Sequence, residues 1–213
     1  MSVSNGWPRY RAAMAQAESY VRILHAAPGS PAVDIYANGN LIAQGLEFEQ
    51  ITEYVPVAPG NYSIQVFPAG RTENPIISTG LTVPTDSSMT VAAVGEPGRL
   101  SLFPVREVYM PMIDRRGAYV RFAHLSPDAP PVDITLPDGT KLFSNVSYRS
   151  YSDYITVAPG TYTLQVRPAG QEQVVLTIPN VTLSPGTIST VYAVGFLDGD
   201  PPLEALLYPD GVY

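Results

Sequence analysis

Two histidine–aspartate pairs are the residues of this chain whose types and spacing could do chemistry. His25 precedes Asp34 by nine residues, and His124 precedes Asp133 by the same interval. An imidazole held by a carboxylate can act as a general base or as half of a metal site. The pair can instead form a structural clamp, which fixes a proline-bounded loop and satisfies polar groups that would otherwise be buried without partners. We expect the clamp, and no enzyme, because no Gly-x-Ser-x-Gly nucleophile motif is present.

Aspartates in predicted turns raise the alternative of a calcium site. Calcium takes six to eight oxygen ligands, often from acidic loops. The acidic positions of the second half are Asp128, Asp133, Asp138, Asp198, Asp200 and Asp210. The first half has Gly29 and Asn38 at two of the matching positions, and Asp before Gly is ordinary turn chemistry. The chain also has no cysteine, so thiolate ligands and disulfides are excluded. We therefore expect no metal and no cofactor.

Tyrosines are the most unusual feature of the composition, with 14 in the chain. Six of them recur at matching positions in the two halves, and we interpret these as residues of the fold. Tyr62 and Tyr162 follow turns and resemble the corner tyrosine of sandwich domains, whose hydroxyl ties down a loop. Tyr148 and Tyr151 bracket Arg149, and this patch could stack on a sugar, grip a protein strand, or consist of ordinary half-exposed strand residues.

These residues recur because the chain repeats itself. Residues 20–35 and 119–134 are identical at 9 of 16 positions, and residues 54–70 and 154–170 at 11 of 17. The offset changes from 99 to 100 residues, so the second copy gains one residue near Pro137 and Asp138. Each copy must therefore form the same fold and supply its own core.

Within each copy the hydrophobic period is two, which is typical of strands. Asn38-Gly39 and Asp138-Gly139 are dipeptides that favour type I′ hairpin turns, and Ala-Pro-Gly at 58–60 and 158–160 marks another turn. About seven short strands per copy, with frequent turns, predict an all-β fold. We expect two tandem immunoglobulin-like or transthyretin-like antiparallel β-sandwich domains.

The segments outside the strands complete the predicted organisation. Residues 1–19 form a leader with a short Ala-rich helix near 9–18, which is a frayed end, a docked helix or an assembly arm. The first sandwich spans 20–105 and the second 119–213. The linker, 106–118, is too apolar for a flexible tether and predicts a fixed contact between the domains.

Charge and hydropathy exclude several classes of partner. The formal net charge is −7, so an acidic surface would repel nucleic-acid phosphates and anionic lipid. No apolar run approaches the roughly 18 residues of a membrane helix, and residues 1–20 contain no signal-peptide apolar region. We expect neither nucleic-acid binding nor membrane insertion.

The motif HLSPDAPPVDI at residues 124–134 closely resembles the opening signature of a bacterial family known as domain of unknown function 4397. The Ala-Pro-Gly-Thr-Tyr turn at 158–162 and Pro-Ala-Gly at 168–170 resemble that family too, and the resemblance covers both copies. It implies a β-sandwich, often in tandem, in envelope-associated or exported proteins, with no assigned activity.

From these features we expect a non-catalytic structural or interaction module of the bacterial cell surface, envelope or spore. It would bind a protein partner or associate with itself. The alternative is a module that binds a carbohydrate or another small ligand, with Tyr148, Arg149 and Tyr151 or the histidine loops as its site.

Overall fold

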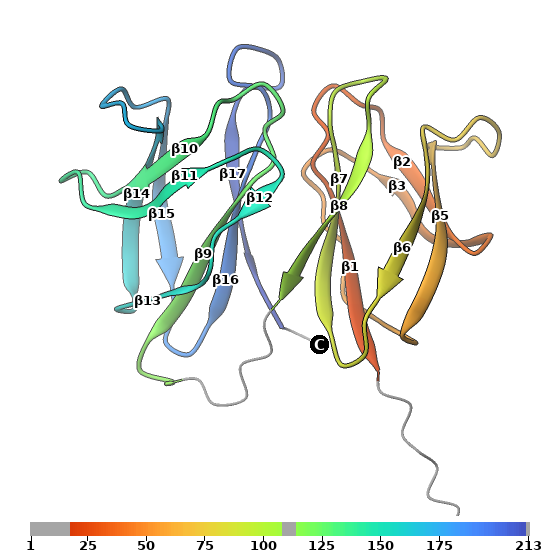
Figure 1. The fold of residues 1–213 in the computed structure, drawn as a ribbon, viewed down its shortest axis with the longest axis horizontal. Coiled ribbons are helices and arrows are strands. Elements are labelled where there is room, and N and C mark those ends of the chain that lie inside the picture. Colours follow the sequence, from red (N-terminus) through yellow and green to blue (C-terminus); the bar gives the residue numbers. More distant parts are fainter. Residues whose placement is uncertain (1–17, 108–113, 212–213) are drawn as a thin grey trace, which may run out of the picture.

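The computed structural model describes residues 18–107 and 114–211, which form two tandem all-β domains placed side by side (Figure 1). This confirms the predicted all-β class and the tandem organisation. Residues 18–107 and 114–211 contain no helix, and thus none that is long and apolar enough to cross a membrane. The helix expected near 9–18 and the middle of the linker, 108–113, lie outside the described residues.

Repeat one is built from two four-stranded sheets, with strand orders β4-β1-β7-β8 and β3-β2-β5-β6. Strand β1 pairs in parallel with β7, whereas its other neighbour, β4, is antiparallel. The strands are β1 (Ser19–His25), β2 (Val33–Ala37), β3 (Asn40–Leu46), β4 (Val55–Val57), β5 (Gly60–Pro68), β6 (Ile77–Val83), β7 (Ser88–Val94) and β8 (Ser101–Glu107).

Repeat two has the same plan. One sheet has the order β11-β10-β14-β15, and the other has β12-β9-β16-β17 with the short strand β13 also paired to β9. Its strands are β9 (Ala118–His124), β10 (Val132–Thr135), β11 (Lys141–Val146), β12 (Ser150–Tyr151), β13 (Ile155–Val157), β14 (Gly160–Pro168), β15 (Leu176–Leu183), β16 (Ile188–Val194) and β17 (Glu204–Pro209).

The first hairpin differs between the repeats because of one residue. In repeat one Asn38 and Gly39 have φ of 49° and 79°, as the predicted type I′ turn requires. In repeat two only Gly139 of the pair has a positive φ, of 88°, and its N–H donates to the carbonyl of Leu136. The type I′ prediction is therefore wrong for repeat two, because the extra Pro137 lengthens the loop.

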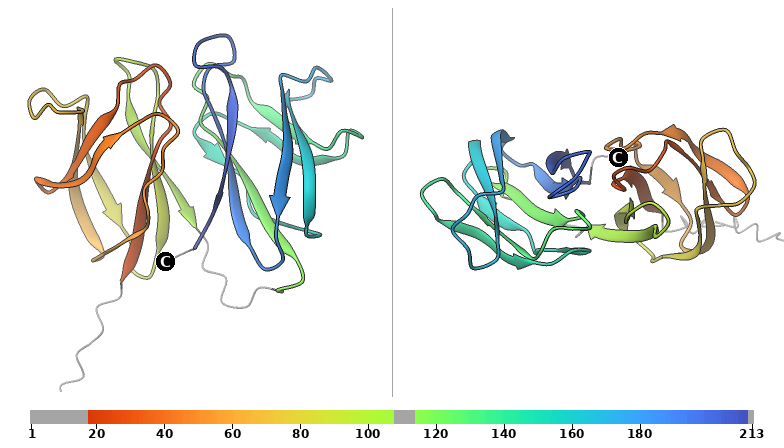
Figure 2. Two further views of the ribbon diagram at one scale, coloured as in Figure 1. Left: turned by 180° about the vertical axis from the view of Figure 1, so that it is seen from behind. Right: turned by 90° about the horizontal axis from the view of Figure 1, so that it is seen from above.

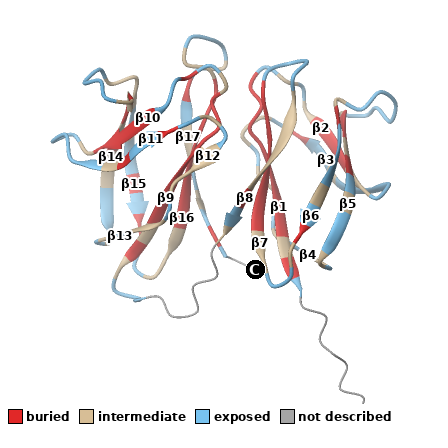
Figure 3. Cartoon of the chain, in the orientation of Figure 1, coloured by how far each residue is buried: buried red, intermediate tan, exposed pale blue. Residues whose placement is uncertain are grey.

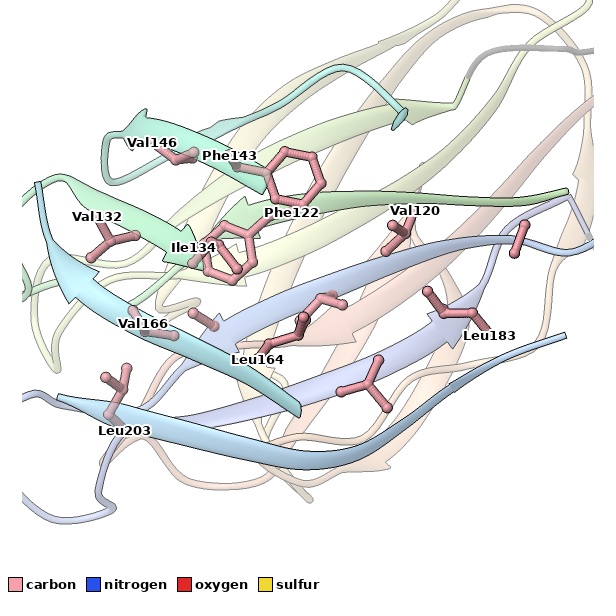
Figure 4. Close-up of a cluster of buried hydrophobic side chains, with 14 residues drawn as sticks. Val120, Phe122, Val132, Ile134, Phe143, Val146, Leu164, Val166, Leu183 and Leu203 are labelled. Carbon is pink, nitrogen blue, oxygen red and sulfur yellow. The ribbon is translucent and has the colours of Figure 1, made fainter. Parts of the chain in front are cut away.

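Each sandwich encloses a core made by one face of each of its sheets. In repeat two this core holds Phe122 and Phe143, whose rings stack with centroids 6.5 Å apart, together with the aliphatic side chains drawn in Figure 4. The corner tyrosines fix the edge of each core, since Tyr62 donates to the carbonyl of Ala58 at 2.7 Å and Tyr162 to that of Ala158 at 2.5 Å. Their predicted role is thereby confirmed.

The central strands of the two facing sheets, β1, β7, β9 and β16, are buried on both sides (Figure 3). In β7, for example, Met89 and Val91 face the core of repeat one, while Ala92 and Val94 belong to a second cluster shared with repeat two. The views in Figure 2 show these sheets facing each other between the two sandwiches. An apolar strand such as β7 therefore has to be buried on both of its faces. One face packs in the core of its own repeat, and the other packs against the other repeat.

Candidate functional site

The two predicted histidines are buried and hold loops. Nε2 of His25 lies 3.1 Å from the carbonyl oxygen of Pro31, and Nε2 of His124 lies 3.1 Å from that of Pro130. Each side chain thus closes the proline-bounded loop that follows its strand. Burial lowers the pKa of both imidazoles below its ordinary value, so both rings are neutral at neutral pH.

The paired aspartates hold other turns. Asp34 accepts hydrogen bonds from the backbone N–H groups of Gly45, at 2.7 Å, and Gly70, at 2.8 Å. Asp133 makes the matching bonds to the N–H groups of Asn145 and Gly170. None of the hydrogen bonds described for these residues joins a histidine to its paired aspartate.

Asp133 has a further partner, the ammonium group of Lys141, at 2.7 Å. Burial opposes ionisation of Asp133, but Lys141 and the two backbone donors outweigh it and lower the pKa of the carboxyl. Within the described part of the chain, no cluster of three or more His, Asp or Glu side chains could hold a metal ion.

Tyr148, Arg149 and Tyr151 lie together, but two of them contact the other repeat. The Tyr151 ring is 6.1 Å from that of Phe103 in repeat one, and the Arg149 guanidinium lies 5.9 Å from the centroid of the same ring. Tyr148 packs edge-on against His124, with centroids 6.3 Å apart. The patch predicted as a free binding surface is therefore partly occupied by repeat one.

The most concentrated set of buried charges lies between the repeats. Arg22 and Arg121 occupy matching positions in β1 and β9, and their side chains are 5% and 1% exposed. Each Nε donates to a threonine of its own repeat at 2.8 Å, Thr90 for Arg22 and Thr190 for Arg121. We call the sheet faces that carry these residues the pairing face.

Each arginine also crosses to the other repeat. Nη1 of Arg22 donates to the carbonyl of Pro209 at 2.7 Å, and Nη1 of Arg121 donates to the carbonyl of Arg106 at 2.5 Å. Pro209 and Arg106 hold matching places in β17 and β8, opposite Ser189 and Met89. The contact is therefore reciprocal, as in a twofold-symmetric dimer interface.

Two carboxylates and two tyrosines complete this set. Tyr54 donates to Glu107 at 2.5 Å, and Tyr154 donates to Asp210 at 2.7 Å. Burial, and after it the nearby charge of Asp210, raises the pKa of Glu107. Burial also raises the pKa of both tyrosine hydroxyls, which therefore remain protonated donors.

The reciprocity breaks down at the carboxylates. Asp210 reaches across, and its Oδ1 accepts from Nη2 of Arg22 at 2.7 Å. Glu107 instead accepts from Tyr54 and Thr90 of its own repeat, and in repeat two it accepts from the N–H of Gly211, at 3.2 Å, and not from Arg121. Nη2 of Arg121 therefore has no hydrogen-bond partner among the described residues, and its nearest carboxylate oxygen, Oδ2 of Asp210, is 3.8 Å away.

In the apolar part of the pairing face, the two repeats carry residues of different size at matching positions. Where repeat one has Leu24, repeat two has the small Ala123, and all members of the shared cluster are buried. The reverse holds at two other matching positions, where Ala26 and Ala92 of repeat one correspond to Leu125 and Tyr192 of repeat two. Two copies of one repeat would therefore fill this cluster differently from one copy of each.

Sequence reasoning missed the pairing face, although two signals pointed to it. Arg22 and Arg121 interrupt short apolar strands at the same repeat position, and a charge there is rarely buried without partners. Strand β7, with the sequence SMTVAAV, is also apolar on both of its faces. Neither signal shows that these residues are buried by the other repeat.

Comparisons with known proteins support the family and say little beyond it. The model of the family described as "Domain of unknown function (DUF4397)" matches twice, over residues 19–115 and 118–212. No curated protein matches the chain. Among solved structures, the C-terminal domain of AlgF from P. aeruginosa is 22% identical, with a TM-score of 0.35, over 44% of this chain and 98% of that domain.

A second solved structure is CBMbc (family CBM26) from Eubacterium rectale Amy13K in complex with maltoheptaose. It is 10% identical, with a TM-score of 0.28, over 92% of this chain and 98% of that one. Both similarities are too low to support a functional comparison. The two family matches together span nearly all of the described residues, and the chain therefore belongs to the DUF4397 family, of which it carries two tandem copies.

Proposed function

We propose that the protein is a non-catalytic structural or interaction module of the bacterial cell surface, envelope or spore, in which both repeats act as one unit that binds a protein partner or itself. The observation that supports this most is the use of the buried charges. Arg22, Arg121 and Asp210 join the two repeats instead of lining a cleft.

The buried histidines support the same reading. Their rings are 1% exposed and neutral, and each holds a backbone carbonyl. A general base needs to reach a substrate proton, and a residue enclosed in this way has no open path to one. Buried charges that join two domains can fix their relative geometry, and we infer that role here.

For the fold, we infer the transthyretin-like form of the expected sandwich. In an immunoglobulin-type domain the first two strands share a sheet. Here β1 and β2 lie in different sheets, and β1 pairs in parallel with β7. This strand order supports the transthyretin-like alternative.

The test of the function is to locate the native protein and its neighbours. Source cells, and spores where they form, would be cross-linked, fractionated and probed for the protein. We expect enrichment in the envelope or coat fraction, cross-linked to another protein or to a second copy. A soluble, uncross-linked protein would contradict the proposal, as would a turnover activity that is lost in His25→Ala and His124→Ala.

A further inference from the structure

The sheet β3-β2-β5-β6 has an outer face that points away from repeat two (Figure 1). Residues that pair directly across strands share a face, so the register defines this surface. Tyr36 on β2 pairs with Leu41 on β3 and with Gln65 on β5, and Gln65 pairs with Ser78 on β6. One row of side chains therefore crosses all four strands. The next row adds Ser63, which pairs with Gly80.

This outer face of repeat one carries hydroxyl, amide, aromatic and aliphatic groups but no charge in these two rows. Leu41 is 46% exposed, and Ser63 and Ser78 are exposed as well. The nearest carboxylate on the face, that of Asp34, is 4% exposed and is bound by two backbone N–H groups. The Tyr36 ring is held edge-on by the buried Phe67, with centroids 5.5 Å apart and an interplanar angle of 86°.

Repeat two shows that the fold does not require this surface. The matching row there is Lys141, Thr135, Gln165 and Thr177, and Arg167 replaces Phe67. Lys141 forms an ion pair with Asp133, and Arg167 donates to Thr135 at 3.2 Å. The same sheet therefore folds with charged and small residues at these positions, so neither the exposed Leu41 nor the ring of Tyr36 is required by the fold.

We propose that the outer face of repeat one binds a neutral saccharide chain. An aromatic ring and an aliphatic side chain suit the C–H faces of sugar rings, and the flanking amide and hydroxyl groups suit their hydroxyls. The charge of the surface decides between classes of glycan. An acidic or sulfated chain would meet no cation in these rows and would be repelled by a protein of net charge −7. A neutral chain needs no cation and is not repelled by the net charge.

The experiment is a titration of the full, 15N-labelled chain, followed by NMR, with four neutral hexasaccharides. These are cellohexaose, maltohexaose, xylohexaose and N-acetylchitohexaose, each added to millimolar concentration, with hexagalacturonate as the anionic comparison. We expect at least one neutral chain to shift the amide signals of β2, β3, β5 and β6. No shift with any of the four would overturn the proposal, as would stronger binding of hexagalacturonate or shifts confined to the segment 148–151.

The matched variants exchange repeat-one residues for those of repeat two. Tyr36→Thr combined with Leu41→Lys should weaken binding about tenfold or more, because it removes both apolar contacts. Tyr36→Phe keeps the ring and should retain most of the affinity, and Thr177→Ala on the matching face of repeat two should leave it unchanged. Unaltered binding in the double variant would overturn the site.

Well-dispersed spectra of each variant would show that it is folded. The outcome is separate from the proposed structural role, since the outer face shares no residue with the pairing face. A negative saccharide titration would therefore not change the interpretation of the cross-linking experiment.

Discussion

Arg22 and Arg121 have the same place in their repeats and different surroundings. Both stack on tyrosines, Arg22 at 4.4 Å from the centroid of Tyr54 and Arg121 at 4.5 Å from that of Tyr154. Arg22 has in addition a close carboxylate from the other repeat, at 2.7 Å, whereas the closest carboxylate oxygen to Arg121 is 3.8 Å away. The difference arises because Asp210 reaches the arginine of the other repeat, whereas Glu107 contacts repeat two through the N–H of Gly211 and not through Arg121.

This comparison shows how a symmetric contact becomes selective. Both copies have the arginine, the threonine and the tyrosine, so the contacts of these residues follow the same pattern in both directions. The carboxylates and the sizes of the apolar residues differ, and these differences favour the pairing of repeat one with repeat two. Selectivity of this kind arises when the wrong pair would leave a buried charge unpaired or a cavity unfilled.

The largest effect is expected for Asp210→Ala. It removes the closest carboxylate of the buried Arg22, which keeps only the oxygen of Glu107 at 3.8 Å, and it removes the acceptor of Tyr154. Breaking a buried pair from one side costs about 3–5 kcal/mol of unfolding free energy. Urea unfolding followed by circular dichroism should show the loss, and the single transition should separate into two. As a control, Asp138→Ala in an exposed turn should change little, and equal effects of both variants would contradict the importance of the crossing carboxylate.

The next effect concerns the sizes of the apolar residues. Leu24→Ala should cost about 2–5 kcal/mol, because it opens a cavity in the cluster shared by the repeats. Ala123→Leu should cost about 1–3 kcal/mol by overpacking. If the two positions compensate across the pairing face, the double variant should lose less than the sum of the single losses. Strict additivity in urea unfolding would show that each position packs independently.

Replacing each arginine by methionine tests the difference between them directly. Arg22→Met leaves Oδ1 of Asp210 without its donor, whereas Arg121→Met removes a guanidinium whose Nη2 has no partner among the described residues. We expect the Arg22 variant to lose at least about 1 kcal/mol more unfolding free energy than the Arg121 variant. Equal losses would mean that the contact with Asp210 contributes no net stability.

The smallest effect is the pH dependence of Glu107. Its pKa is raised in the folded protein, so the folded state holds its proton more tightly than the unfolded chain. The group therefore contributes stability at pH values below its unfolded pKa, and this contribution is lost as the pH rises through the folded pKa. Relative to wild type, Glu107→Gln should become more stable as the pH rises from about 4.5. A difference between the two proteins that stays constant with pH would contradict this.

Much of the fold could be predicted from the sequence because its determinants are local. The period of two, the turn dipeptides and the repeat offset indicated strands and two copies, and the corner tyrosines were assigned correctly. The I′ turn at Asp138-Gly139 was wrong because an added proline changes the loop length, and dipeptide preference does not report that. The hydrogen-bond partners of the histidines and their paired aspartates could not be predicted, since all those described except Lys141 are backbone groups placed by the fold.

The sequence by itself determined two similar sandwiches, each with its own core, because strand periodicity and turn chemistry act over a few residues. Only the tertiary structure decided that the second apolar face of β1, β7, β9 and β16 is covered by the other repeat, and that Asp210 crosses to Arg22. Those contacts join residues up to 188 positions apart. Their geometry depends on how two finished sheets pack, and no local pattern in the chain records that packing.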